Sequence, residues 1–159
     1  TNLSTAQFLV FIEDVIPEQG PLQVIPGSHR GEVYDHYDED ESWLGYIRND
    51  FLDGVPLDQA EELTGPAGTV TAHHCATVHS SRPNTSARPR PALVIGYNAE
   101  DARPYTAPAY PSSHHGQVVR GSAAKYARHD HINLRLPPDW SGGYTSIFTH
   151  QEQTGRDKS

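Results

Sequence analysis

The sequence predicts an all-β protein, in which short strands form a β-sandwich or a barrel-like jelly roll with few short helices. Several segments are rich in β-branched and aromatic residues and alternate in polarity, which is typical of strands. Gly and Pro occur 13 times each, so turns are frequent. A helical repeat of apolar residues is almost absent, and 159 residues are enough for one domain with one core.

The first predicted strand covers residues 6–15, and a second short strand covers residues 22–25. The apolar side chains of the first strand alternate between two faces, with Phe8, Val10 and Ile12 on one and Leu9 and Phe11 on the other. Because both faces are apolar, we expect this strand to be covered on both sides, or nearly so. Pro and Gly residues follow each strand and end it.

Residues 32–55 have a different character. The segment 32–42 is rich in Asp and Glu. Runs of charge usually form solvated surface, so we predict a solvated loop here, or a lid over the substrate. We also expect a short helix over residues 43–49 and a short strand within residues 56–63.

Three strands are predicted in the middle of the chain. Residues 69–74 alternate in polarity after a Gly- and Pro-rich turn, and a brief strand follows near residues 77–80. Residues 89–99 form the third. Its two faces carry different sets, with Leu93, Ile95 and Tyr97 on one and Arg90, Ala92 and Val94 on the other.

After residue 100 the periodicity is weak, and we expect short strands only at residues 116–120 and 131–135. The chain contains no Met and enters its first strand within a few residues of its start. We therefore expect one domain over residues 1–148 that lacks its N-terminal part. A polar tail covers residues 149–159.

Composition narrows the function. A formal net charge of −8 argues against nucleic-acid binding, which needs a basic face. No apolar run reaches the ~18 residues of a membrane span, and nothing resembles a signal peptide. Cys75 is the single cysteine, so a reducing compartment is expected, and we predict the cytoplasm. The sequence does not indicate an oligomeric state.

Three blocks of sequence point to a specific chemistry. Residues 18–30 read EQGPLQVIPGSHR, residues 68–81 read GTVTAHHCATVHSS, and residues 82–90 read RPNTSARPR. In order and spacing they resemble the phytanoyl-CoA dioxygenase family. That family has an N-G-P-L-x-x-x-P-G-S-H block, then G-D-x-x-x-F-H-x-x-x-x-H-x-S, then P-N-x-S and an Arg. Arg90 comes eleven residues after His79, as in the family.

The resemblance implies a double-stranded β-helix, which is the cupin-like jelly roll, and a non-haem dioxygenase that uses Fe(II), 2-oxoglutarate and O₂. In that family His79 would be a catalytic iron ligand, Arg90 would bind the far carboxylate of 2-oxoglutarate, and Ser81 would add a hydrogen bond to it. The residue types suit these roles. Neutral imidazole is a good ligand for Fe(II), and the planar fork of Arg matches a carboxylate.

Each of these residues also has a structural interpretation. His79 alone could be a core histidine, and Arg90 alone could belong to an ion pair. We expect His74, at the family's F-H position, to be structural, His29 to shape a turn beside the pocket, and Cys75 to be a buried thiol.

One departure from the family pattern matters. The other two iron ligands form an H-x-D pair upstream of the first strand, where this chain has only residues 1–5. His36 and Asp38 have the right spacing but lie in the acidic loop, so we do not expect them to bind iron. His129 and His131 lie outside the pattern.

A zinc site made of His73, His74 and His79 is also possible on composition. It is disfavoured because adjacent residues of a strand point to opposite faces.

The sequence therefore predicts an Fe(II)- and 2-oxoglutarate-dependent dioxygenase that hydroxylates or otherwise oxidises a small organic substrate. The alternative is a non-catalytic jelly-roll binding protein that has lost its iron site. An H-x-D pair encoded upstream would favour the enzyme.

Overall fold

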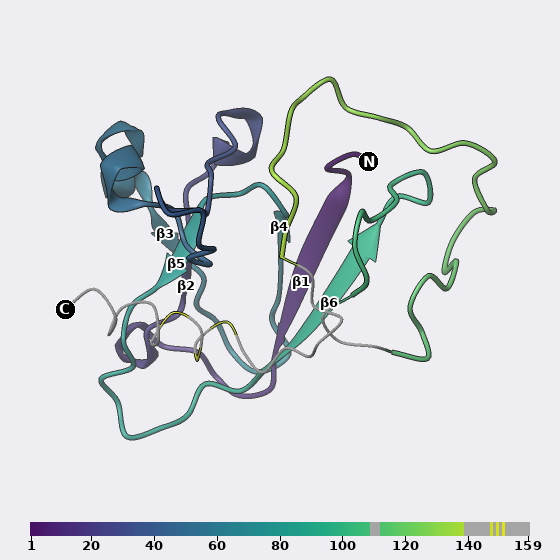
Figure 1. Ribbon diagram of the computed structural model, residues 1–159. Coiled ribbons are helices and arrows are strands. Elements are labelled where there is room, and N and C mark those ends of the chain that lie inside the picture. The colour runs from purple at the N-terminus through teal and green to yellow at the C-terminus, as the bar shows by residue number, and fades with distance from the viewer. Residues whose placement is uncertain (109–111, 139–146, 148, 150, 152–159) are drawn as a thin grey trace.

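In the part of the chain that the structure describes, the named elements are two three-stranded antiparallel sheets and four short 3-10 helices (Figure 1). The structure is a computed structural model that describes residues 1–108, 112–138, 147, 149 and 151. The first sheet has the order β4 (Val70–His74), β1 (Thr5–Phe11) and β6 (Ala92–Asn98). The second has the order β3 (Glu61–Glu62), β2 (Leu22–Val24) and β5 (His79–Ser81). The prediction of a strand-dominated chain with few short helices is confirmed.

The helices lie between the strands. They are η1 (Pro17–Gln19), η2 (Ser28–Arg30), η3 (Asn49–Gly54) and η4 (Leu57–Gln59). All but η3 are three residues long, as expected where Pro and Gly interrupt the chain every few residues.

The core lies between the two sheets, against one face of β1. Leu9 and Phe11 are buried on this face and pack with Val15, and Leu22 of the second sheet packs against them. We call this the inner face of the first sheet. Opposite residues in paired antiparallel strands point to the same side, so the register assigns each residue of β4 and β6 to a face.

The other face of the first sheet, the outer face, exposes several apolar side chains on either side of β1, among the described residues. Val70 is 58% exposed, Leu93 52% and Ile12 56%. Phe8 and Tyr97 contact each other edge to face on this side, with ring centroids 5.6 Å apart. The expectation that both faces of this strand are covered, or nearly so, holds in part: Phe8 and Val10 are partly buried, and the exposed side chains lie beside them. Alternation identified two apolar faces, but it did not identify what packs on them.

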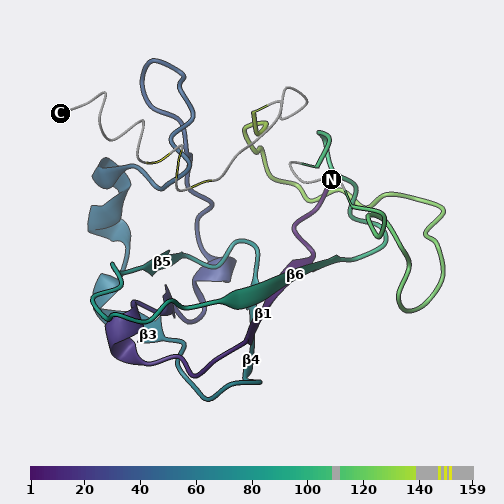
Figure 2. The ribbon, with the colours of Figure 1, turned by 90° about the horizontal axis from the view of Figure 1, so that it is seen from below.

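The acidic segment forms an irregular loop, and the helix expected at residues 43–49 is wrong. Trp43 forms a β-bridge with Tyr37 instead. Gly45 takes a left-handed conformation with φ of +72°, which interrupts a helix, and the helical turn begins at Asn49. Figure 2 shows the region from below.

Other boundaries agree in part with the sequence. The strand expected within residues 56–63 is reduced to β3, which follows η4. The strands expected at residues 116–120 and 131–135 are wrong, because both segments are irregular. The second segment instead follows Asp130, whose carboxylate accepts a hydrogen bond from Leu3 N at 2.9 Å. Short alternation without a partner strand is a weak signal.

The expected polar tail from residue 149 falls almost entirely outside the described residues. In the part that is described, none of the helices has the length and apolarity needed to cross a membrane.

Candidate active site

The three motif blocks pack against one another. Ser28 of the first block accepts a hydrogen bond from Val78 N of the second at 2.9 Å and donates one to Ile25 O at 2.7 Å. Ile25 N also donates to Val78 O at 3.0 Å. The hydroxyl of Ser28 therefore fixes the segment that leads into β5.

The first and third blocks meet at Gly20. Its φ is +59°, and a Cβ built on it would lie 2.1 Å from the carbonyl oxygen of Arg82, so only glycine fits. Next to it the buried Gln19 donates from Nε2 to Pro89 O at 2.8 Å and accepts from Ile16 N at 3.0 Å. These contacts fix the loop that precedes β6.

His79 and Ser81 share one face of β5. They lie opposite Val24 and Leu22 of β2, and Leu22 packs against the core, so both side chains face the first sheet. His79 Nδ1 lies 2.7 Å from Thr77 O. A carbonyl oxygen only accepts, so Nδ1 carries the proton and Nε2 is left with a lone pair.

His73 lies beside His79, a proximity that the sequence did not single out. Its ring centroid is 5.5 Å from that of His79, at an interplanar angle of 47°. His73 is opposite Gln7 of β1, two residues before Leu9, and so belongs to the inner face. Burial lowers its pKa, and His79 lowers it further. The alternation of residues 69–74 is the signal in the sequence that could have found His73, because it places His73 and His74 on opposite faces.

The acidic loop places a second histidine, His36, close enough to His79 for their charges to interact. Burial lowers the pKa of His36, Asp35 opposes this, and His79 adds to the decrease. Asp38 instead accepts hydrogen bonds from Asp40 N at 3.0 Å and Ser42 N at 2.8 Å. This carboxylate caps its own turn.

Arg90 precedes β6 on the inner-face side. Ala92 lies opposite Phe11, Pro91 O accepts a hydrogen bond from Ile12 N at 3.4 Å, and Arg90 directly precedes Pro91. The Nε of Arg90 is buried and has no hydrogen-bond partner among the described residues. Its neighbour Arg88 reaches Glu13 at 3.6 Å instead. Arg90 therefore offers a buried donor that the described protein does not use.

The remaining histidine motif residues have structural contacts. His74 lies one residue after His73 and points to the outer face, as expected for adjacent residues of a strand. Its Nδ1 accepts from Ala76 N at 3.1 Å, and its ring lies 5.4 Å from that of His29. Cys75 is half-buried, and burial raises its pKa. Across the described ranges, no three His, Cys, Asp or Glu side chains are placed to hold a metal ion.

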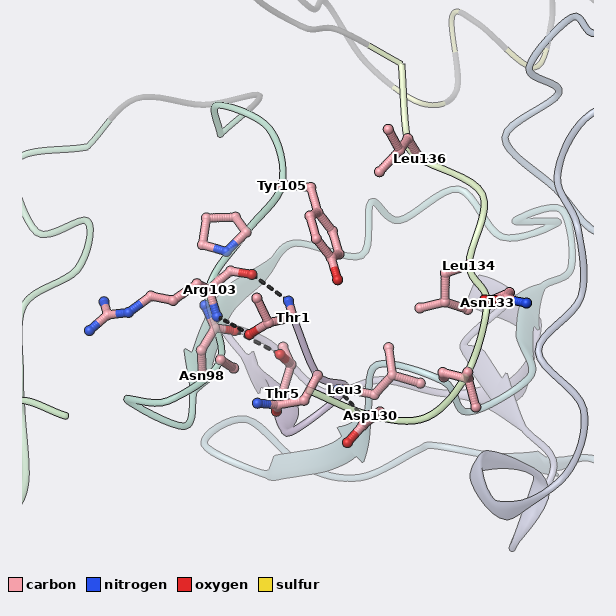
Figure 3. Close-up of a pocket in the computed structure, with 14 residues that line it drawn as sticks. Thr1, Leu3, Thr5, Asn98, Arg103, Tyr105, Asp130, Asn133, Leu134 and Leu136 are labelled. Atoms are coloured by element: carbon pink, nitrogen blue, oxygen red, sulfur yellow. Dashed lines mark hydrogen bonds between the residues drawn. The ribbon is translucent and has the colours of Figure 1, made fainter. Parts of the chain in front are cut away.

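A cavity of about 520 Å³ lies at the end of the first sheet where β1 begins and β6 ends (Figure 3). Thr5 and Asn98 form one wall, and Thr5 Oγ1 donates to Asn98 Oδ1 at 2.9 Å. Tyr105, Leu134 and Leu136 line other parts of it.

The acidic loop is joined to this cavity wall through Arg135. The guanidinium of Arg135 stacks over the ring of Tyr37, 4.3 Å from its centroid, and reaches Asp35 and Glu41 at 3.3 Å each. Tyr37 also donates from its hydroxyl to Leu136 O at 2.9 Å. We call this group the Arg135 cluster.

Comparison with known proteins supports the motif blocks. The family model described as phytanoyl-CoA dioxygenase (PhyH) matches residues 2–92. The probable alpha-ketoglutarate-dependent hypophosphite dioxygenase of Stutzerimonas stutzeri is 34% identical over 89% of this chain and 50% of its own length. The L-proline trans-4-hydroxylase of Streptomyces griseoviridis is 39% identical over 64% of this chain and 42% of its own.

Solved structures agree. EctD from S. alaskensis with 2-oxoglutarate and 5-hydroxyectoine aligns with a TM-score of 0.54 at 26% identity, over 77% of this chain and 41% of that one. The carbocyclase SnoK from nogalamycin biosynthesis aligns with a TM-score of 0.51 at 30% identity, over 64% of this chain and 39% of that one. The chain thus spans about half, or less, of the length of these relatives.

Proposed function

The chain belongs to the phytanoyl-CoA dioxygenase family, and on that basis we propose that it is the larger part of the active site of a non-haem Fe(II)- and 2-oxoglutarate-dependent dioxygenase. When bound, the metal and 2-oxoglutarate supply the oxidising chemistry with O₂. The residues of this chain bind and orient these groups.

We propose that the two sheets are the halves of a double-stranded β-helix in one domain over residues 1–148. The antiparallel pairing and the alignments with EctD and SnoK support this. In such a barrel the inner faces line the site, and His79, Ser81 and Arg90 all lie on the inner side.

His79 is the proposed iron ligand. Its Nδ1–H is held by Thr77 O, which orients the ring and leaves Nε2 for a metal. Metal-binding histidines generally donate their other nitrogen to a carbonyl or carboxylate in this way. A 2-His-1-carboxylate site needs two more ligands, and among the described residues no two other His, Cys, Asp or Glu side chains join His79 to complete it.

Arg90 is the proposed anchor of 2-oxoglutarate, with Ser81 beside it on β5. The observation that carries the proposal is the buried, unpartnered Nε of Arg90. A buried guanidinium without an acid is unfavourable, and a bound carboxylate would satisfy it with a charge-assisted pair.

The substrate class follows from the relatives. Their names give hypophosphite, L-proline and ectoine as substrates, all of them small molecules. We propose a small-molecule substrate for this chain as well, and, from its net charge of −8, no nucleic-acid partner. The free thiol of Cys75 supports a reducing compartment such as the cytoplasm.

The test is an anaerobic titration of the full-length protein with Fe(II) and then 2-oxoglutarate, followed by the visible charge-transfer band of the complex. Arg90→Ala should weaken 2-oxoglutarate binding by at least about tenfold, the loss of one charge-assisted pair, and leave iron binding unchanged. Arg88→Ala, which removes an exposed neighbour, should change neither. Absence of the band in the wild-type protein would favour the non-catalytic binding protein.

A further inference from the structure

Two polar atoms on the inner face of β4 are buried and have no hydrogen-bond partner among the described residues. They are Nδ1 of His73 and Oγ1 of Thr71. Buried polar atoms are nearly always hydrogen-bonded, so an exception calls for a partner that the described residues do not supply. Two such atoms on adjacent inner-face positions of one strand indicate a ligand.

The position of this ligand is next to the proposed metal. The rings of His73 and His79 are 5.5 Å apart between centroids. Thr71 is opposite Leu9, which is in the core, so the strand holds both polar side chains in a fixed direction. A molecule that contacts Nδ1 of His73 therefore lies close to His79 as well.

The ligand at this position is distinct from the far carboxylate of 2-oxoglutarate. His73 lies on β4 and Arg90 precedes β6, and β1 separates these two strands. Neighbouring strands are about 4.8 Å apart, so the two strands are about 10 Å apart. Arg90 and His73 thus serve opposite sides of the inner face.

The residue type also sets this chain apart from the family pattern. That pattern has Phe where this chain has His73. Phe and His offer flat rings of similar width, but only the histidine ring carries nitrogens that donate or accept hydrogen bonds. The exchange adds polarity at the site without removing the ring.

We propose that His73, with Thr71 beside it, binds the primary substrate and selects a small molecule that presents a hydrogen-bonding polar group to Nδ1 of His73, next to His79. This inference rests on the proposed function, because it takes His79 as the iron ligand. It adds a substrate-contacting residue on β4 and a requirement on the substrate.

The test uses the full-length protein loaded with 2-oxoglutarate and Mn(II), which keeps the complex from turning over. Hypophosphite, L-proline and ectoine are titrated by calorimetry into the wild type, His73→Phe, His73→Asn and Thr71→Val. Asparagine places an amide group close to where Nδ1 lies, so it tests that atom. His129→Phe is the control, because His129 is exposed and lies outside the motif blocks.

The expected result is that His73→Phe weakens binding of the probe that the wild type prefers by about tenfold or more, as for loss of a hydrogen bond in a closed site. His73→Asn should recover most of the affinity, Thr71→Val should show a smaller loss, and the control should match the wild type. The Kd for 2-oxoglutarate should change less than about twofold in all of them.

Equal probe binding by wild type and His73→Phe would overturn the inference. If the wild type binds none of the three probes, the structure of the loaded full-length protein decides. A protein atom within hydrogen-bonding distance of His73 Nδ1 would overturn the inference, and an open cavity at Nδ1 would uphold it. If the wild type does not bind 2-oxoglutarate, that result would instead contradict the proposed function.

Discussion

The Nδ1 of His79 donates a hydrogen bond to the carbonyl oxygen of Thr77, two residues earlier and 2.7 Å away. Thr77 is itself buried, and its N–H bonds to His74 O at 2.9 Å. The turn between β4 and β5 therefore fixes the orientation of the imidazole before any ligand binds. A metal that binds at Nε2, as proposed, would therefore find the tautomer of the ring already set.

Replacing His79 should remove iron binding without unfolding the chain. His79 is exposed in this structure, so its loss creates no core cavity. We expect His79→Ala to weaken Fe(II) binding by at least about 100-fold, more than the usual loss from an outer-sphere partner. Iron content after equilibrium dialysis measures this, with His129→Ala as the control. Retained iron in His79→Ala would contradict the assignment.

Ser81 and Ser80 provide a matched pair of tests. Ser81 shares the inner side of β5 with His79, and Ser80 points the other way. Ser81→Ala should weaken 2-oxoglutarate binding by about tenfold, as for one hydrogen bond to a carboxylate. Ser80→Ala should have no effect. Equal effects of the two substitutions would show that Ser81 does not face the co-substrate.

Gly20 should be among the most sensitive glycines. Alanine there needs a left-handed backbone and a Cβ 2.1 Å from Arg82 O. We expect Gly20→Ala to lower the free energy of unfolding by about 2 kcal/mol or more, a combination of backbone strain and steric displacement. Gly54→Ala is the control, because no atom lies within 4 Å of its added Cβ. Urea unfolding of both variants compares them.

The Arg135 cluster should control the mobility of the acidic loop. Arg135→Ala removes the contacts to Tyr37, Asp35 and Glu41 together. We expect faster proteolysis within residues 32–48 and a higher KM for the substrate, because exposed pairs are weak singly but act here as a network. Arg120→Ala, at another exposed arginine, should leave both unchanged. Unchanged cleavage and KM in Arg135→Ala would exclude a lid role.

Acidification should destabilise the metal-free protein through His36. Its folded pKa lies below the ordinary value of 6.5, chiefly because of burial, so the unfolded chain binds the proton more readily. Stability should therefore fall as the pH drops below about 6.5 toward the folded pKa. His36→Gln should reduce this dependence in thermal unfolding measured between pH 7.5 and pH 5.5. An identical pH profile in the variant would show that His36 is not the group responsible.

Sequence alone predicted the strands that carry the motifs, because β1 and β6 are rich in β-branched and aromatic residues and β4 alternates in polarity. It failed at residues 43–49, where Gly45 prevents the helix, and at residues 116–120 and 131–135, where the segments lack partner strands. The resemblance of the three blocks to the family pattern, and not spacing by itself, predicted His79 and Arg90 as site residues. His73 and His36 approach His79 from another strand and from a loop, and no local pattern in one sequence encodes such contacts.

The exposed apolar side chains on the outer face of the first sheet have a practical consequence for handling the protein. Ile12, Val70 and Leu93 are each more than half exposed on this face. Exposed apolar side chains that lie close together promote self-association and aggregation. Polar substitutions at these three positions should therefore raise the concentration at which the protein stays in solution.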